Sequence, residues 1–143
     1  MRISDVLRSK GADVATVSPE VTVATLLDRL AERRVGAMVV QTADQTLVGI
    51  VSERDVVRAL HSDGAALLDA PVAQIMTAEV STAAPTDSVE HVMRVMTEQR
   101  VRHVPVVDHG RLVGIVSIGD VVKSRIDDLQ STTAHLESYI TGR

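Results

Sequence analysis

A serine and an aspartate recur in this chain at the same spacing, each time after the same apolar run. The stretch LVGIVSERDVV places Ser52 three residues before Asp55, and LVGIVSIGDVV places Ser117 three residues before Asp120. A helix that begins at such a serine offers backbone amides and the positive end of its dipole to a phosphate group. The carboxylate can accept hydrogen bonds from two neighbouring hydroxyls. The pair therefore fits the two parts of a ribose phosphate.

The same spacing also has a purely structural explanation. In a capping box, S-x-x-[DE], the serine oxygen accepts a hydrogen bond from a free backbone amide of the first helical turn, and the acid three residues later accepts one from the serine amide. On this interpretation the two motifs only begin helices. The two interpretations are compatible, and the residues leave both open.

Both motifs belong to a duplication of nearly the whole chain. Pro19 pairs with Pro85 and Val40 with Val106, and the register changes by one residue in the turn at 42–46. Each copy predicts a short strand before its proline, a helix, two strands joined by a polar turn, and a second helix that begins at the repeated serine.

Helical spacing is clearest after each proline, where apolar residues recur at i, i+3, i+4 and i+7. Asp87 and Glu90 are predicted to form the capping box of the second of these helices. The runs at 37–41 and 103–107 are rich in β-branched residues and predict strands, as do the returning LVGIV runs. The apolar positions are Val23, Leu26, Leu27 and Leu30 in the first copy and Val89, Val92, Met93 and Met96 in the second.

The predicted fold class is α/β (α+β): two pseudo-symmetric β-α-β-β-α repeats packed sheet to sheet, with equivalent clefts on the two sides. We expect the first repeat at residues 1–60, a linker at 61–71, the second repeat at 72–127 and a C-terminal helical extension at 128–143. The chain has 143 residues, about the size of one ordinary domain, so the repeats should form one compact module.

The C-terminal extension has a stripe of its own. Ile126, Leu129, Leu136 and Ile140 fall near a 3.5-residue spacing, with Thr133 at the remaining position. Such a stripe can pack on its own domain or form a contact between two copies of the chain. Both alternatives remain open.

Composition excludes several classes of function. Phe, Trp and Cys are absent and Tyr139 is the sole aromatic residue, so there is no stacking platform for single-stranded nucleic acid, no disulfide and no cysteine nucleophile. The net charge is −4 with no basic run, which disfavours nucleic acid as a partner. No export signal and no membrane-spanning apolar run is visible. We expect a cytoplasmic protein.

Catalysis and metal binding are also disfavoured. No histidine is placed as a base in both repeats, since His103 aligns with Ala37 and His91 with Thr25. The five histidines lack the spacing of metal ligands. We therefore expect no enzyme activity, no catalytic residue, no catalytic cofactor and no metal site.

The doubled GIVSERDV and GIVSIGDV, together with VRHVPVV, resemble a tandem pair of cystathionine-beta-synthase (CBS) domains, or Bateman module, of the stand-alone bacterial or archaeal type. The resemblance covers roughly residues 1–127. It implies a regulatory module that senses an adenosyl ligand such as AMP, ADP, ATP, NAD or S-adenosylmethionine. It also implies a homodimer and a separate effector protein. The alternative is a structural or dimerisation module whose clefts are vestigial.

The resemblance implies two nucleotide clefts, each drawing residues from both repeats. Asp55 and Asp120 would bind ribose hydroxyls, and the arginines of the first cleft predict tighter phosphate binding there. Val39 departs from the pattern, because the second repeat has Pro105 at this position. The implied first cleft comprises Ser52, Arg54, Asp55, Thr82, Arg102, His103 and Pro105, and the second comprises Thr16, Ala37, Met38, Ser117 and Asp120.

Overall fold

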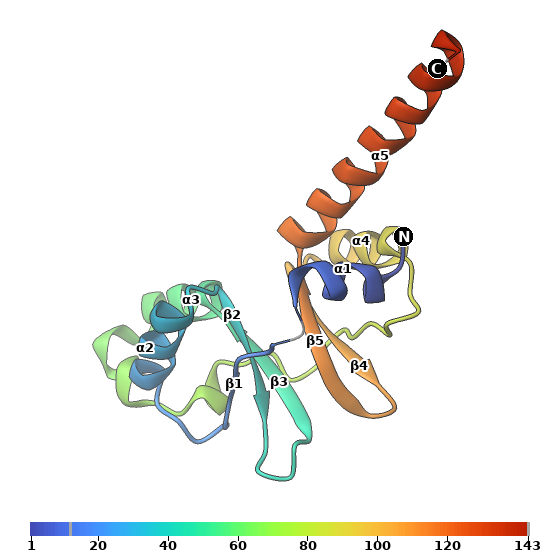
Figure 1. Cartoon of the computed structure of the whole chain (residues 1–143). Helices are drawn as coiled ribbons and strands as arrows, with labels where there is room; N and C mark the ends of the chain where they lie inside the picture. Colours follow the sequence, from blue (N-terminus) through green and yellow to red (C-terminus); the bar gives the residue numbers. More distant parts are fainter. Residues whose placement is uncertain (12, 143) are drawn as a thin grey trace. The chain divides into compact units, whose positions relative to one another are not determined.

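The computed structural model describes residues 1–11 and 13–142, which form a mixed α/β chain with two small sheets (Figure 1). The repeated order of strand, helix, strand, strand and helix is confirmed in the first repeat. The elements in chain order are α1 (Ile3–Lys10), β1 (Thr16–Val17), α2 (Val23–Arg33), β2 (Ala37–Gln41), β3 (Leu47–Ser52), α3 (Glu53–Asp63), the 3₁₀ helices η1 (Gly64–Asp69) and η2 (Val72–Gln74), α4 (Val89–Gln99), β4 (His103–Asp108), β5 (Arg111–Ser117) and α5 (Ile118–Thr141).

The described residues form two compact units, and each is described here by itself. Unit 1 contains residues 1–11, 82–108 and 114–142, and unit 2 contains residues 13–81 and 109–113. The leading segments are thus exchanged between the repeats. Helix α1 begins the first repeat in the sequence but packs with the second, and residues 72–81, which begin the second repeat, pack with the first. The predicted repeat bounds of 1–60 and 72–127 follow the sequence, whereas the packing units cross them.

Unit 2 is built on a three-stranded sheet in the order β1-β2-β3. Strand β1 runs parallel to β2, and β3 returns antiparallel to β2 with Ala37 opposite Ser52. The predicted helix α2 buries Val23, Leu26 and Leu30 in an aliphatic core that also includes Met38 of β2. The helical spacing read from the sequence is therefore the spacing of the buried face.

Unit 1 contains β4, the part of β5 from Gly114 onward and helices α1, α4 and α5. The strand predicted before Pro85 is reduced here to a single parallel bridge between Ala83 and Val106. In the first repeat, the Val39 amide extends the β1–β2 pairing by donating to the Ala15 carbonyl. The equivalent residue is Pro105, which has no N–H to donate, so the second repeat keeps the shorter pairing.

Helix α4 begins differently from the prediction. Its N-cap is Ser88, whose side chain accepts a hydrogen bond from the His91 amide at 3.0 Å. Asp87 instead accepts from the Ala84 amide at 2.8 Å, one turn earlier in the chain. The predicted Asp87–Glu90 capping box is therefore wrong by one position, because either Asp87 or Ser88 can cap and the backbone of the preceding turn takes the aspartate.

The segment expected as a linker is folded. Helix α3 continues to Asp63 and η1 follows at once, with Leu67 only 1% exposed in the core of unit 2. The Val23 amide donates to the Ala70 carbonyl, which ties the end of this segment to the start of α2. In the part of the chain that the structure describes, no helix is both long enough and apolar enough to span a membrane.

Candidate functional site

Ser52 and Asp55 form a reciprocal cap at the junction of β3 and α3. The Ser52 amide donates to Asp55 Oδ2 at 2.8 Å, Ser52 Oγ lies 3.1 Å from the same oxygen, and the Asp55 amide donates to Ser52 Oγ at 3.4 Å. The turn is fixed because β3 ends with Ser52 in an extended conformation and the helix begins at the next residue. The capping-box interpretation of this motif is confirmed.

Ser117 and Asp120 repeat this geometry at the junction of β5 and α5. The Ser117 amide donates to Asp120 Oδ2 at 2.8 Å, and the Asp120 amide donates to Ser117 Oγ at 3.2 Å. Both aspartates are half-buried. In both, the amide of the capping serine donates to the Oδ2 atom of the aspartate. An ionised carboxylate has about four acceptor sites, so one that forms a cap can still accept a hydrogen bond from a hydroxyl.

The backbone amides of these helix starts are largely engaged within the protein. The Glu53 amide donates to the Gly36 carbonyl at 3.0 Å, and the Ile118 amide donates to the Arg102 carbonyl at 2.8 Å. The aspartate amides are bonded to the serine oxygens. At most one of the first three amides of each helix thus remains for an anion. A phosphate group at either site would depend mainly on cationic side chains.

Lys10 is the cation that the structure places at Asp120. Its Nζ lies 2.6 Å from Asp120 Oδ2 and donates to the Ile115 carbonyl at 2.7 Å. Burial raises the pKa of the Asp120 carboxyl, but the Lys10 hydrogen bond, the Ser117 hydrogen bonds and the Lys10 charge together outweigh it and hold the pKa below its usual value. The aspartate is therefore ionised and already paired at neutral pH.

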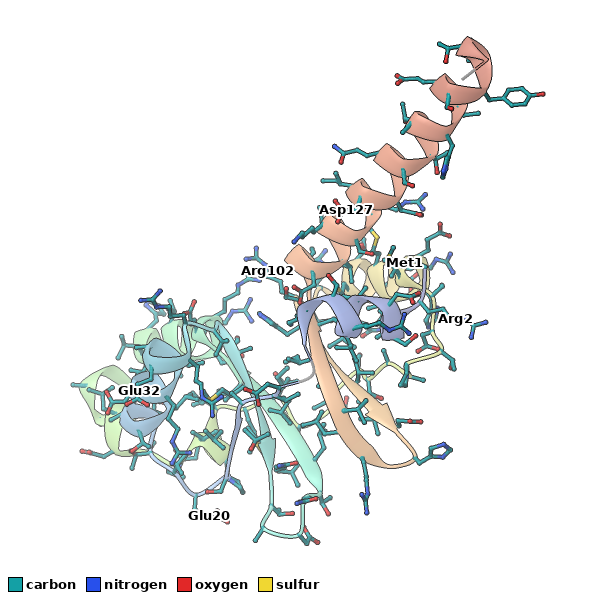
Figure 2. The ribbon with its side chains drawn as sticks, in the orientation of Figure 1. Met1, Arg2, Glu20, Glu32, Arg102 and Asp127 are labelled. Atoms are coloured by element: carbon teal, nitrogen blue, oxygen red, sulfur yellow. The ribbon has the colours of Figure 1, made fainter. Side chains whose placement is uncertain are left out.

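A cavity of about 250 Å³ lies beside this pair in unit 1. It opens between α1 and the first turns of α5, and Figure 2 labels Met1 and Asp127 at this end of α5. Its charged lining is mixed, with Lys10 and Lys123 among three acidic residues. The lining residues are Met1, Asp5, Val6, Ser9, Lys10, Asp120, Lys123, Ser124 and Asp127.

Replacing Lys10 with methionine is expected to lower the free energy of unfolding at pH 7 by about 1 kcal/mol, since it removes a partly buried charge-assisted hydrogen bond. Because the pair depresses the pKa of Asp120, its contribution is present above the unfolded pKa of about 3.9 and is lost as pH falls through the lower folded value. The difference between wild type and variant should therefore shrink below about pH 4. Denaturant unfolding at several pH values measures it.

Arg8→Met is the matched control for this prediction. Arg8 lies on the same helix and pairs with Asp5 at 3.6 Å, but its side chain is 79% exposed. Such an exposed pair contributes little to stability. A Lys10→Met variant as stable as Arg8→Met at pH 7 would contradict a structural role for the Lys10–Asp120 pair.

The remaining predicted site residues are divided between the units. Unit 2 carries Ser52, Arg54 and Asp55 of the first predicted cleft, and it also carries Thr16, Ala37 and Met38 of the second. Arg54 is exposed on α3, whereas the Met38 side chain is 1% exposed within the core. Only the backbone of Met38 is thus suited to a ligand.

Unit 1 carries the complementary residues. Thr82 and Arg102 are exposed, His103 is half-buried at the start of β4, and Pro105 is buried. These four belong to the first predicted cleft, and Ser117 and Asp120 of the second lie in the same unit. Each unit therefore carries part of both predicted clefts, and how the parts meet stays a prediction.

Lys10 is the functional candidate that sequence reasoning missed. It lies 110 residues from Asp120, and the sequence analysis predicted no element at the N-terminus. The apolar spacing of Ile3, Val6 and Leu7, all buried in α1, was the available signal for a helix there. No local pattern indicated its partner. Within residues 1–11 and 13–142, no group of three or more His, Cys, Asp or Glu side chains is arranged to hold a metal ion.

Comparison with known proteins agrees with this architecture. The family model of the CBS domain matches the chain twice, at residues 3–62 and 72–127. The crystal structure of the CBS-domain containing protein ATU1752 from Agrobacterium tumefaciens is 43% identical, with a TM-score of 0.86 over 87% of this chain and 99% of that one.

The similar structures include complexes with adenosyl ligands. The CBS domain protein PAE2072 from Pyrobaculum aerophilum, complexed with AMP, is 32% identical with a TM-score of 0.75 over 84% of this chain and 89% of its own. The CBS domain pair of protein MJ0100, complexed with 5-methylthioadenosine and S-adenosyl-L-methionine, is 25% identical with a TM-score of 0.79 over 90% of this chain and 98% of that chain. With both of its repeats matched, this chain belongs to the CBS-domain family as a tandem pair.

Proposed function

We propose that this chain is a regulatory module that binds an adenosyl nucleotide between its two CBS repeats, with Asp55 and Asp120 accepting hydrogen bonds from ribose hydroxyls. The observation that carries the proposal is the duplicated carboxylate, which a cap through Oδ2 holds at the same strand-to-helix junction in both repeats. The AMP complex of PAE2072 and the adenosyl complexes of MJ0100 support the same ligand class.

The proposed sites differ in their cations. Arg54 and Arg102 are exposed and are proposed to contact the phosphate of a ligand at the Asp55 cleft, where charge-assisted hydrogen bonds are about twice as strong as neutral ones. At the Asp120 cleft, a ribose would share the carboxylate with Lys10, whose Nζ lies 2.6 Å from Asp120 Oδ2. We therefore propose that phosphorylated ligands such as AMP, ADP or ATP bind more tightly at Asp55, and that NAD and S-adenosylmethionine are further candidates.

Regulation follows from ligand placement. A ligand that contacts both repeats favours the arrangement of the two units that it binds best, by as much as its difference in affinity for the alternatives. The proposed output is a change in the surface offered to a homodimer partner or to an effector protein. No chemical step is required, and the proposal assigns no catalytic residue.

A thermal-shift panel of AMP, ADP, ATP, NAD and S-adenosylmethionine tests the proposal. A ligand at 100 times its dissociation constant should add about 2.7 kcal/mol of apparent stability, a shift of several degrees. A panel in which no ligand raises the melting temperature would favour the second candidate, a structural dimerisation module. The exposed apolar side chains of α5 are the observation that supports this second candidate.

A further inference from the structure

Helix α5 carries an apolar stripe that its own unit leaves uncovered. The helix has 24 residues and runs on past α1 and α4 (Figure 1), and side chains project to both sides of its distal half (Figure 2). Large aliphatic side chains repeated along one face normally mark an interaction surface. The stripe residues and their exposed fractions are Val122 41%, Ile126 49%, Leu129 52%, Leu136 58% and Ile140 81%.

The face of α5 that packs on unit 1 is a different one. Val121 and Ser124 are its buried residues, and Ser124 lies two positions from both Val122 and Ile126. Two positions correspond to about 200° around a helix with 3.6 residues per turn. The side of α5 opposite Ser124 thus holds the stripe. Packing on α1 and α4 within unit 1 therefore does not cover these residues.

The stripe has the spacing of a coiled-coil seam. From Val122 to Ile140 its positions alternate by four and three residues, with Thr133 completing the series. This 3.5-residue repeat keeps one narrow face toward a partner helix. A second helix with the same spacing is therefore the natural partner, and the chain itself supplies one in a second copy.

Charge complementarity selects the orientation of the pair. If two α5 helices run antiparallel about a two-fold axis at Ser131, Val122 packs against Ile140 of the second copy, and Lys123 then lies opposite Glu137. The symmetry forms this ion pair twice. A parallel pair would instead place Glu137 beside Thr132 and leave Lys123 without an acid opposite it.

We propose that two copies of this chain pair through α5 as a short antiparallel coiled coil centred on Ser131, with Lys123 and Glu137 fixing the orientation. The pairing does not depend on nucleotide binding. Its layers are Val122 with Ile140, Ile126 with Leu136 and Leu129 with Thr133. The threonine makes the two central layers weaker than the aliphatic layers on either side.

Analytical ultracentrifugation of the full chain tests whether the stripe forms the dimer. Wild type is expected to sediment as a concentration-dependent dimer, and Leu129→Glu as a folded monomer with an unchanged circular dichroism spectrum. Ser131→Glu adds the same charge on the opposite face and should leave the dimer intact. A wild-type monomer at about 100 μM, roughly 5.5 kcal/mol of association energy or less, or a Leu129→Glu dimer, would overturn the proposal.

Charge reversal tests the orientation. Lys123→Glu or Glu137→Lys alone places like charges opposite each other twice and should weaken the dimer roughly tenfold. The double variant Lys123→Glu/Glu137→Lys restores both attractions and should return the dissociation constant to within about twofold of wild type. Single variants with no effect, or a double variant weaker than either single, would exclude the antiparallel pair.

Disulfide trapping provides an independent measure of register, because the chain contains no cysteine. Mixed Ile126→Cys and Leu136→Cys proteins should form a crosslinked heterodimer under mild oxidation. Ile126→Cys alone should not crosslink, since its partner cysteine would lie about 15 Å away along the helix. Efficient crosslinking of Ile126→Cys with itself would show a parallel pair and refute the proposed orientation.

Discussion

Asp55→Asn is expected to weaken AMP binding by roughly ten- to a hundredfold, or about 1.5–3 kcal/mol, while the fold is retained. The amide oxygen of asparagine can still accept the Ser52 amide, which now lies 2.8 Å from Asp55 Oδ2. The variant therefore keeps most of the cap but loses the negative charge that a pair of ribose hydroxyls would share. Calorimetric titration gives the dissociation constant, and thermal unfolding reports the fold.

Asp87→Asn is the matched control. Asp87 is a half-buried aspartate that also accepts a backbone amide, from Ala84 at 2.8 Å, but it belongs to neither predicted cleft. Its substitution should leave AMP affinity unchanged within about twofold. Equal affinities for wild type and Asp55→Asn would mean that Asp55 serves only as a helix cap.

Gly49→Ala is expected to lower the free energy of unfolding by about 1–3 kcal/mol. A Cβ at this position would lie 2.7 Å from Met76 Sδ and 2.9 Å from the Thr77 carbonyl oxygen. The Met76 sulfur can move, but the Thr77 carbonyl is held in place by two backbone hydrogen bonds. The Ile50 amide donates to the Thr77 carbonyl at 3.0 Å, and the Thr77 amide donates to the Ile50 carbonyl at 2.8 Å. The backbone of β3 must therefore shift or lose part of this bridge. Urea denaturation measures the loss.

Gly119→Ala makes the same chemical change where space exists. The nearest atom to its added Cβ is Ser117 Oγ at 3.6 Å, an ordinary contact, and the residue lies in the first turn of α5. Alanine is the better helix former, so this variant should be at least as stable as wild type. If Gly49→Ala unfolds at the same urea concentration as Gly119→Ala, the close contact with Thr77 does not explain why residue 49 is a glycine.

The sequence predicted most of the secondary structure because periodicity and duplication reinforce each other. Val23, Leu26 and Leu30 carry the helical spacing of α2, and each is 3% exposed or less. The prediction failed where two neighbouring residues could each cap the same helix, as Asp87 and Ser88 can for α4. It also failed where a proline lacks the backbone N–H that strand pairing needs, as Pro105 does. The exchange of leading segments between units depends on tertiary packing, and no local pattern encodes it.

The candidate site was predicted only in part, because some of its contacts are local in the sequence and others are not. The Ser52–Asp55 and Ser117–Asp120 pairs are local, so their capping geometry follows from four consecutive residues. The contact between Lys10 and Asp120 joins residues 110 positions apart and could not be read from spacing. It changes the expected charge of the second site, which the sequence had indicated to be poor in cations.

The most direct test of ribose recognition compares AMP with 2′,3′-dideoxy-AMP by calorimetry on wild type and Asp55→Asn. Removing the hydroxyls should weaken binding to wild type roughly ten- to a hundredfold, and should cost Asp55→Asn no more than about threefold, because the carboxylate that they contact is already gone. If wild type binds the dideoxy compound as tightly as AMP, the repeated aspartate does not hold the sugar, and the account of these clefts as nucleotide sites built on it is wrong.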